Sequence, residues 1–110
     1  MDKDELYQKG MEAFADDKFE EAIGYLCQAV QIDSDFADAY NALAMACYHH
    51  GDFGGAIQAS KRLTELQPEN VLAWTSLSMA YQRKGMIPEA EAAGGKAKEL
   101  GFKSTFKPKA

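Results

Sequence analysis

The sequence predicts an all-α solenoid of three stacked helix–turn–helix units, and three observations indicate this fold class. Residues of like character return every 34 positions, a period typical of stacked-repeat proteins. Each period divides into two amphipathic stretches separated by a short break. Three periods cover 102 of the 110 residues, so one domain is expected. The period is seen in four columns: Leu6, Tyr40 and Trp74; Gly10, Ala44 and Ser78; Phe19, Phe53 and Ile87; Ala22, Ala56 and Ala90.

The units are expected at about residues 3–36, 37–70 and 71–104, followed by a short tail at 105–110. Their first helices are predicted at 4–16, 37–50 and 71–84, and their second helices at 19–31, 53–66 and 88–100.

Local residue choices support these helix ends. Gly51 and Gly85 suit the left-handed residue that commonly follows a helix. Segments 33–35 and 67–70 offer side-chain oxygens that cap the next helix. The glycine pair at 94–95 lowers helix propensity by up to about 1 kcal/mol per residue, so the last helix is expected to fray unless its alanine-rich face is tightly packed.

Charge is distributed unevenly along the chain. The net charge of −5 combines −8 over residues 1–40 (3 bases, 11 acids), −1 over 41–70 and +4 over 71–110 (7 bases, 3 acids). The acidic balance argues against nucleic-acid binding. No stretch resembles a signal peptide or a membrane span, so a cytoplasmic location is expected. Cys27 and Cys47 are too few for a disulfide framework and are interpreted as reduced thiols.

Two of the units carry a recognisable residue pattern. The third reads Trp74-x-x-Leu77-Ser78-x-x-Tyr81 and then Ala90, and the second reads Tyr40-x-x-Leu43-Ala44-x-x-Cys47 and then Ala56 and Pro68. This pattern resembles the tetratricopeptide repeat (TPR). The resemblance implies six helices in a right-handed superhelical array with a concave groove. It also implies a module that binds a protein or peptide, with no catalysis and no cofactor.

The outer faces of the array look polar. Where the later first helices carry packing residues, the first unit has Glu5, Lys9 and Glu12. In the last helix, Glu91 and Lys98 replace the mainly apolar residues of earlier units. Terminal repeats need such solvent-facing surfaces, so a complete three-repeat protein is expected.

In the family that the chain resembles, the first helices line the groove. Methionine recurs there once per unit, and a flexible, polarizable ridge of this kind can adapt to a bound peptide. The alternative is that the methionines fill gaps between helices. The predicted peptide-binding residues are Tyr7, Met11, Phe14, Asn41, Met45, Tyr48, His49, Thr75, Met79, Gln82 and Arg83.

Some members of this family grip the terminal carboxylate of chaperone tails with Lys, Asn and Arg. The matching positions here are Tyr7, Met11, Ala42, Leu72 and Ser76. Since none of these side chains is cationic, recognition of such acidic tails is predicted to be absent.

Neither a metal site nor a catalytic site is expected. Cys47, His49 and His50 form the only candidate cluster, and it offers too few ligands for a metal. His49 is expected to contact a partner instead.

An unidentified protein or peptide partner is expected, and a monomer is favoured over a homo-oligomer. The alternative is a self-associating scaffold, because oppositely charged ends permit head-to-tail contacts. In the tail, Phe102 and Phe106 could cover the last helix or dock on a partner, although a disordered end beyond Ser104 is favoured.

Overall fold

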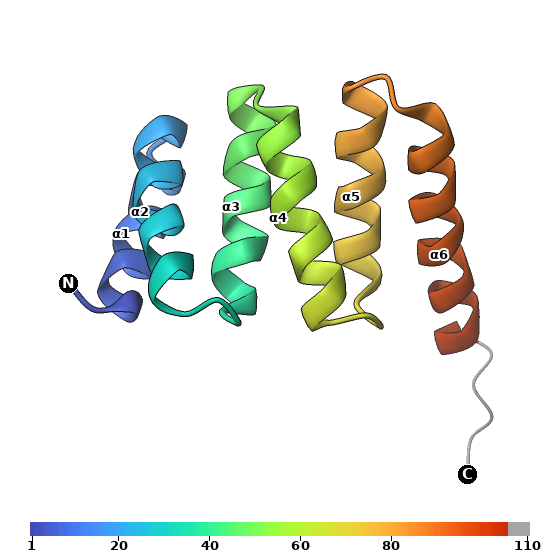
Figure 1. Ribbon diagram of the computed structural model, residues 1–110, viewed down its shortest axis with the longest axis horizontal. Coiled ribbons are helices and arrows are strands. Elements are labelled where there is room, and N and C mark those ends of the chain that lie inside the picture. The colour runs from blue at the N-terminus through green and yellow to red at the C-terminus, as the bar shows by residue number, and fades with distance from the viewer. Residues whose placement is uncertain (106–110) are drawn as a thin grey trace, which may run out of the picture.

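The computed structural model describes residues 1–105, with side chains to residue 102. Within that range six helices form a row of three helical hairpins, with no strand among them (Figure 1). The helices are α1 (Lys3–Ala15), α2 (Phe19–Ile32), α3 (Ala37–His50), α4 (Phe53–Leu66), α5 (Val71–Arg83) and α6 (Ile87–Thr105). Each helix packs against the next one along the chain, and the first helices of neighbouring units, α1–α3 and α3–α5, also touch. The predicted all-α solenoid of three helical hairpins is therefore confirmed.

The turn within each unit uses a left-handed residue at the same place in the 34-residue period. Gly51 and Gly85 have φ of 89° and 80°, and Asp17 has φ of 59° in the first unit. Glycine adopts this region without steric cost, and aspartate is among the few other residues that tolerate it. The two glycines were predicted from the sequence, whereas the equivalent role of Asp17 was not.

Of the two side-chain caps predicted in the turns between units, the structure has the one before α5 and lacks the one before α3. The Asn70 side chain accepts hydrogen bonds from the backbone N–H groups of Leu72 and Ala73 and so caps α5. No side chain in segment 33–35 caps α3, which begins after Phe36 without such a bond. The Asp33 carboxylate instead accepts from the Asp35 N–H within the turn itself.

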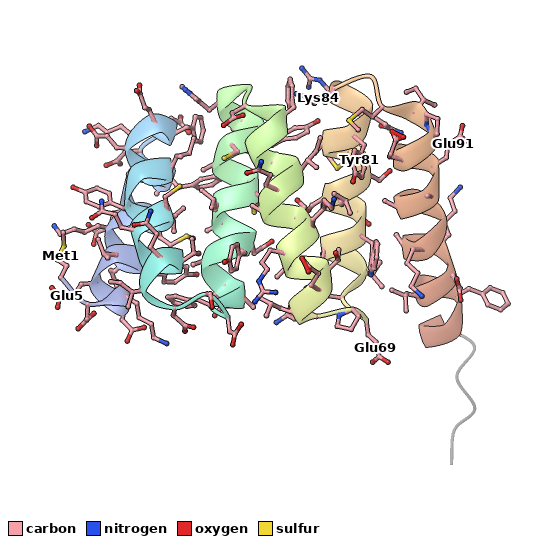
Figure 2. All side chains as sticks on the ribbon, viewed as in Figure 1. Met1, Glu5, Glu69, Tyr81, Lys84 and Glu91 are labelled. Carbon is pink, nitrogen blue, oxygen red and sulfur yellow. The ribbon has the colours of Figure 1, made fainter. Side chains whose placement is uncertain are left out.

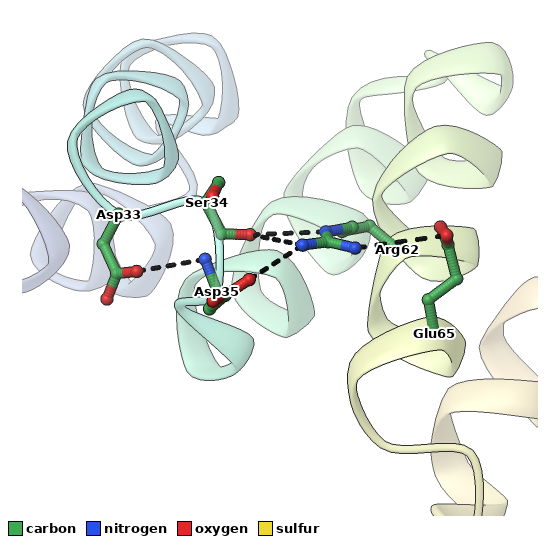
Figure 3. A network of polar contacts seen from close by, with 5 residues as sticks. All are labelled: Asp33, Ser34, Asp35, Arg62 and Glu65. Carbon is green, nitrogen blue, oxygen red and sulfur yellow. Dashed lines mark hydrogen bonds and ion pairs between the residues drawn. The ribbon is translucent and has the colours of Figure 1, made fainter.

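Arg62 of α4 holds the turn between the first two units from outside (Figure 3). Its guanidinium donates to the Ser34 carbonyl oxygen at 3.1 and 3.3 Å and pairs with Asp35 at 2.8 Å. A weaker contact reaches Glu65 one turn along α4 at 4.0 Å. This arginine therefore ties the second helix of one unit to the entry of that unit's first helix.

Small side chains make up most of the core, because the two helices of each hairpin cross closely. Ala22, Ala29, Ala39 and Ala46 are fully buried. At the crossing of α1 and α2, a Cβ atom added to Gly10 would lie 2.7 Å from Cγ of Leu26. This close crossing explains why the column of Gly10, Ala44 and Ser78 holds a small residue in the first unit.

The last helix differs from its prediction. The sequence predicts a helix over 88–100 that frays unless its alanine-rich face is tightly packed, whereas α6 runs without a break from Ile87 to Thr105. Its alanine face compensates for the low helix propensity, since Ala90, Ala93 and Ala97 are buried. The Ser78 hydroxyl of α5 also donates to the Ala90 carbonyl oxygen at 2.8 Å. The helix thereby takes in part of the expected tail; Phe102 is 64% exposed on it, and Phe106 lies outside the described residues.

Both outer faces of the row are polar, as expected. Glu5 at one end of the row and Glu91 at the other mark these faces (Figure 2). Lys9 and Glu12 on α1 and Lys98 on α6 are exposed as well.

Candidate functional site

A pocket of about 340 Å³ opens between α3 and α5, with α4 behind it. It is bordered by the first helices of the second and third units, and the crossing of α3 and α4 forms its inner wall. The helix α3 contributes Asn41, Ala44, Met45, Tyr48 and His49; α4 contributes Ala56 and Ser60; and α5 contributes Leu72, Ser76 and Met79.

Exposed apolar side chains line this pocket. Met45 and Met79 are 42% and 43% exposed, and Leu72 is 73% exposed. Among the lining residues, none carries a permanent charge. Such a surface favours an uncharged ligand, because a buried charge with no partner would be costly.

The methionine of the first unit is about as exposed as the other two of its column. Met11 is 38% exposed on α1, close to the values of Met45 and Met79. The alternative in which all three methionines fill gaps between helices does not fit these exposures, because a gap-filling side chain would be buried.

The structure brings five of the eleven predicted groove residues together in the pocket. These are Asn41, Met45, Tyr48, His49 and Met79. Four others line no described pocket: Tyr7 and Met11 on α1, and Thr75 and Gln82 on α5. The remaining two, Phe14 and Arg83, take part in ring contacts between units. A binding role for the whole set stays a prediction.

The ring contacts repeat at both junctions between units. His49 of the second unit stacks on Phe19 of the first, with ring centroids 5.3 Å apart and an interplanar angle of 19°. One period later, Arg83 of the third unit lies 4.7 Å from the ring centroid of Phe53. Tyr48 contacts both His49 and Phe53 edge-on. Tyr48 and His49, which form one side of the pocket, are therefore held in place by neighbouring rings, and this limits how far they can move.

Residues near the start of α1 form a separate cluster around the Phe36 ring. Tyr7 packs against the Phe36 ring at 5.2 Å, and the Lys3 ammonium lies 5.1 Å from the same ring. Burial raises the pKa of the Tyr7 phenol, and the nearby Asp38 carboxylate adds to that rise. Tyr7 is thus half-buried against the residue that precedes α3 rather than freely presented to a ligand.

A second pocket, of about 500 Å³, lies among α4, α5 and α6 and shares no residue with the first. Its apolar part includes Trp74, Leu77 and Tyr81, and charged side chains flank it. The Trp74 indole N–H donates to the Pro68 carbonyl oxygen at 2.9 Å, which fixes the ring. Sequence reasoning treated these aromatic residues only as repeat markers and did not predict this pocket.

The cysteines are free thiols, as predicted. Cys47 is buried in α3, and the pKa of its thiol is raised to about 12. Burial is the largest cause, and the nearby Asp52 carboxylate and Cys27 add smaller contributions. Cys27 is half-buried, and its pKa is raised by the same burial effect and by Asp52. Such thiols stay protonated at neutral pH and are poor nucleophiles. Among the described side chains, no three His, Cys, Asp or Glu residues are grouped so that they could hold a metal ion.

Comparison with protein families decides the identity of the repeat. The family model for the tetratricopeptide repeat matches residues 6–36 and 37–70. The chain belongs to the tetratricopeptide repeat family. The model does not extend to the third unit, but α5 and α6 form the same kind of helical hairpin there.

Other TPR proteins resemble the chain in sequence and in fold. It is 31% identical over 90 residues to the chloroplastic TPR domain-containing protein PYG7 of Arabidopsis thaliana, covering 78% of this chain and 30% of that protein. A crystal structure of MamA is 29% identical with a TM-score of 0.88, covering 94% of this chain and 61% of that one. The first TPR domain of Spaghetti (RPAP3), solved with the HSP90 peptide SRMEEVD, has the same fold at 21% identity and a TM-score of 0.79, covering 86% and 75%.

The five places that match the family's carboxylate-gripping positions hold no cation. Two of them, Leu72 and Ser76, line the pocket between α3 and α5. Sequence reasoning considered these two only as carboxylate positions and left them out of the predicted groove. Both residues lie in the first two turns of α5, across the pocket from α3. This position on a first helix could have placed them among the predicted groove residues.

No helix in the described part of the chain is both long and apolar enough to span a membrane.

Proposed function

We propose that this TPR chain binds a segment of a partner protein, without catalysing a reaction, and that the segment lies across the pocket between α3 and α5. The observation that carries the proposal is the exposure of Met45, Leu72 and Met79 around one pocket. Large apolar side chains gathered in this way commonly mark a binding surface. The TPR fold supports such a role in protein–protein interaction.

The chemistry of the pocket favours an apolar or uncharged stretch of the partner. Methionine is unbranched and polarizable, so its side chain can adjust to ligands of different shapes. Leu72 loses exposed apolar surface when it is covered, which favours binding by about 25 cal/mol for each Å² buried. Asn41 and Ser76 supply hydrogen-bonding groups at the walls.

We propose further that acidic chaperone tails are not ligands. The first TPR domain of Spaghetti was solved with the HSP90 peptide SRMEEVD, in which three of the last four residues are acidic. At the matching positions this chain has Tyr7, Met11, Ala42, Leu72 and Ser76, which cannot neutralise a carboxylate. In fluorescence anisotropy, labelled SRMEEVD is expected to show no saturable binding; selective, saturable binding would contradict this.

Selection from a phage-displayed library of random dodecapeptides tests the binding function. Peptides enriched on the wild-type chain are expected to lose affinity by more than about tenfold on Met45→Glu, because that variant puts an unpaired carboxylate into an apolar pocket. Gln58→Glu is the matched control, since Gln58 is exposed on α4 outside the pocket. Failure to enrich any peptide, or equal binding to both variants, would remove the pocket from the proposal.

The three units at 3–36, 37–70 and 71–104 are proposed to act as one monomeric binding domain. Sedimentation velocity at several salt concentrations is expected to show a single species of 12.1 kDa. Growth into longer species at low salt would favour the head-to-tail scaffold instead. The cytoplasmic location stays a prediction from the sequence.

A further inference from the structure

The inner wall of the pocket contains a buried hydroxyl with nothing to bond to. Ser60 of α4 is 0% exposed, and its Oγ has no hydrogen-bond partner among the residues that the structure describes. A serine within a helix often bonds back to the carbonyl oxygen four residues earlier, but this one does not. Because nearly all buried polar groups in proteins are paired, each exception calls for an explanation.

The place of Ser60 in the repeat explains why space is left there. The same column holds Leu26 in the first unit and Gly94 in the third, and the family pattern has phenylalanine at this position. Leu26 is fully buried and fills the crossing of α1 and α2. In the second unit, serine is too short to do so, and the pocket forms in front of it together with Ala44 and Ala56.

Three features of the pocket define what can enter it. Its rim is apolar, with Met45 and Met79 both about two-fifths exposed. Its inner wall holds the unpaired Ser60 hydroxyl, which can both donate and accept a hydrogen bond. Its lining includes no permanently charged side chain, so a charged group inside would have no counter-charge.

We infer that this pocket receives one side chain of the bound segment, with an apolar stem and a neutral polar tip, and that the tip hydrogen-bonds to the Ser60 hydroxyl. Glutamine fits this description, because two methylene groups carry an amide that can donate and accept. A Leu side chain would leave the hydroxyl unpaired, and Glu or Lys would bury a charge. The inference rests on the proposed function and adds to it the chemistry of the residue at the centre of the bound segment.

Entry requires the rim to move, since Ser60 is covered in the unbound chain. The two rim methionines have unbranched, flexible side chains, which makes them suited to swing aside. Tyr48 and His49, by contrast, are packed against neighbouring rings. The opening is therefore expected on the side of Met45 and Met79.

The dodecapeptides selected on the wild-type chain provide the probe. The selected sequences are expected to share a glutamine or asparagine among apolar residues. Replacing that amide residue with leucine should weaken binding to the wild-type chain by about tenfold, the effect of leaving one buried group unpaired. The same replacement should change binding to Ser60→Ala by less than about twofold, because that variant has no hydroxyl to satisfy.

Ser76→Ala is the matched control, since it removes a hydroxyl from the wall of the same pocket and keeps Ser60. Circular dichroism of each variant verifies that it is folded. If the peptides bind, lose affinity on Met45→Glu and yet carry no shared amide residue, the inference is overturned and the proposed groove stands. An equal effect of the peptide replacement on wild type and Ser60→Ala has the same meaning. If no peptide is selected, or if Met45→Glu has no effect, the proposed function fails and the inference fails with it.

Discussion

The first and second units solve the same packing problem in different ways. At the crossing of α1 and α2, Gly10 has no side chain and Leu26 fills the space, whereas at the crossing of α3 and α4 the pair is Ala44 and Ser60. In the third unit the pair is Ser78 and Gly94. The side chain on the first helix grows along the array as the one on the second helix shrinks. The comparison teaches that a repeat can keep its backbone while changing whether its crossing is filled or hollow.

The units also differ in how their exits are held. Two ion pairs hold the turn after the first unit: Lys3 pairs with Asp33, and Arg62 pairs with Asp35. The turn after the second unit is held by neutral contacts, through Asn70 and the Trp74 indole. The first unit is thus the filled and ion-paired one, and the second is the hollow one that carries the candidate site.

Removing the side chain that fills the first crossing is expected to have the largest effect. Leu26→Ala should lower the free energy of unfolding by about 2–5 kcal/mol, because it loses buried apolar surface and leaves a cavity. Urea denaturation followed by circular dichroism measures this loss. Ile32→Ala on the same helix is the control, since Ile32 is 57% exposed and should change stability by less than about 0.5 kcal/mol. Equal losses for the two variants would refute the filled crossing.

Adding a methyl group opposite that leucine tests the same crossing from its other side. Gly10→Ala should cost about 1–3 kcal/mol by overpacking against Leu26, despite the better helix propensity of alanine. Gly24→Ala is the control: nothing lies within 4 Å of its added Cβ, so a gain of about 0.5–1 kcal/mol is expected.

Combining Gly10→Ala with Leu26→Ser copies the second unit into the first. In that background the cost of Gly10→Ala should vanish, because the clashing side chain is gone. Additive losses in the double-mutant cycle, measured by urea denaturation, would mean that the two residues do not compete for one space.

Truncating the unpaired hydroxyl of the hollow crossing should stabilise the free protein. Ser60→Ala is expected to raise the free energy of unfolding by about 1 kcal/mol, since it removes a buried group that has no partner. Ser78→Ala makes the same chemical change where the hydroxyl donates to Ala90, and it should cost about 1 kcal/mol. Thermal denaturation of both variants gives the two signs directly, and a loss for Ser60→Ala would show that its hydroxyl has a partner after all.

The sequence predicts the fold well because the fold depends on spacing. Columns such as Leu6, Tyr40 and Trp74 recur at a fixed period, and the predicted bounds of α3 and α4 agree with the structure. The predicted end of α6 at residue 100 was wrong, since the helix continues to Thr105. The tight packing of its alanine face, which the prediction named as the condition for an intact helix, offsets the cost of its glycines.

The candidate site was predicted only in part, for a related physical reason. A stripe such as Met45 and Met79 follows from helical spacing alone. The pocket between them depends on a missing partner: Ser60 stands where Leu26 stands one period earlier. The signal in the sequence is the change in side-chain size within this column, from leucine to serine. A comparison of the three units at that position would have predicted the pocket, whereas the pattern of apolar residues along one helix does not. The hydrogen bonds of Arg62 to Ser34 and Asp35 join residues 28 and 27 positions apart, and nothing local in the sequence indicates them.

The smallest expected effect concerns the ion-paired turn after the first unit. Its contribution to the free energy of unfolding should depend on pH more than that of the neutral turn after the second unit. The hydrogen bond from Lys3 lowers the pKa of the Asp33 carboxyl below 3.8, and the same bond raises the pKa of Lys3 above 10.5. The contribution of Asp33 is therefore present above pH 3.8 and is lost as the pH falls through its lowered pKa. That of Lys3 is present below pH 10.5 and is lost as the pH rises through its raised pKa.

Lys3→Met isolates this pair, because methionine keeps the apolar stem and removes the charge. The pKa of Asp33, followed by the NMR shift of its carboxyl carbon, should rise toward 3.8 in the variant while remaining below it, since the Asp35 N–H still donates to the carboxylate. Lys9→Met is the control, as Lys9 is exposed on the same helix and has no ion pair among the described residues. An Asp33 pKa that responds equally to both substitutions would mean that the general field of the acidic first unit, and not the bond to Lys3, sets its value.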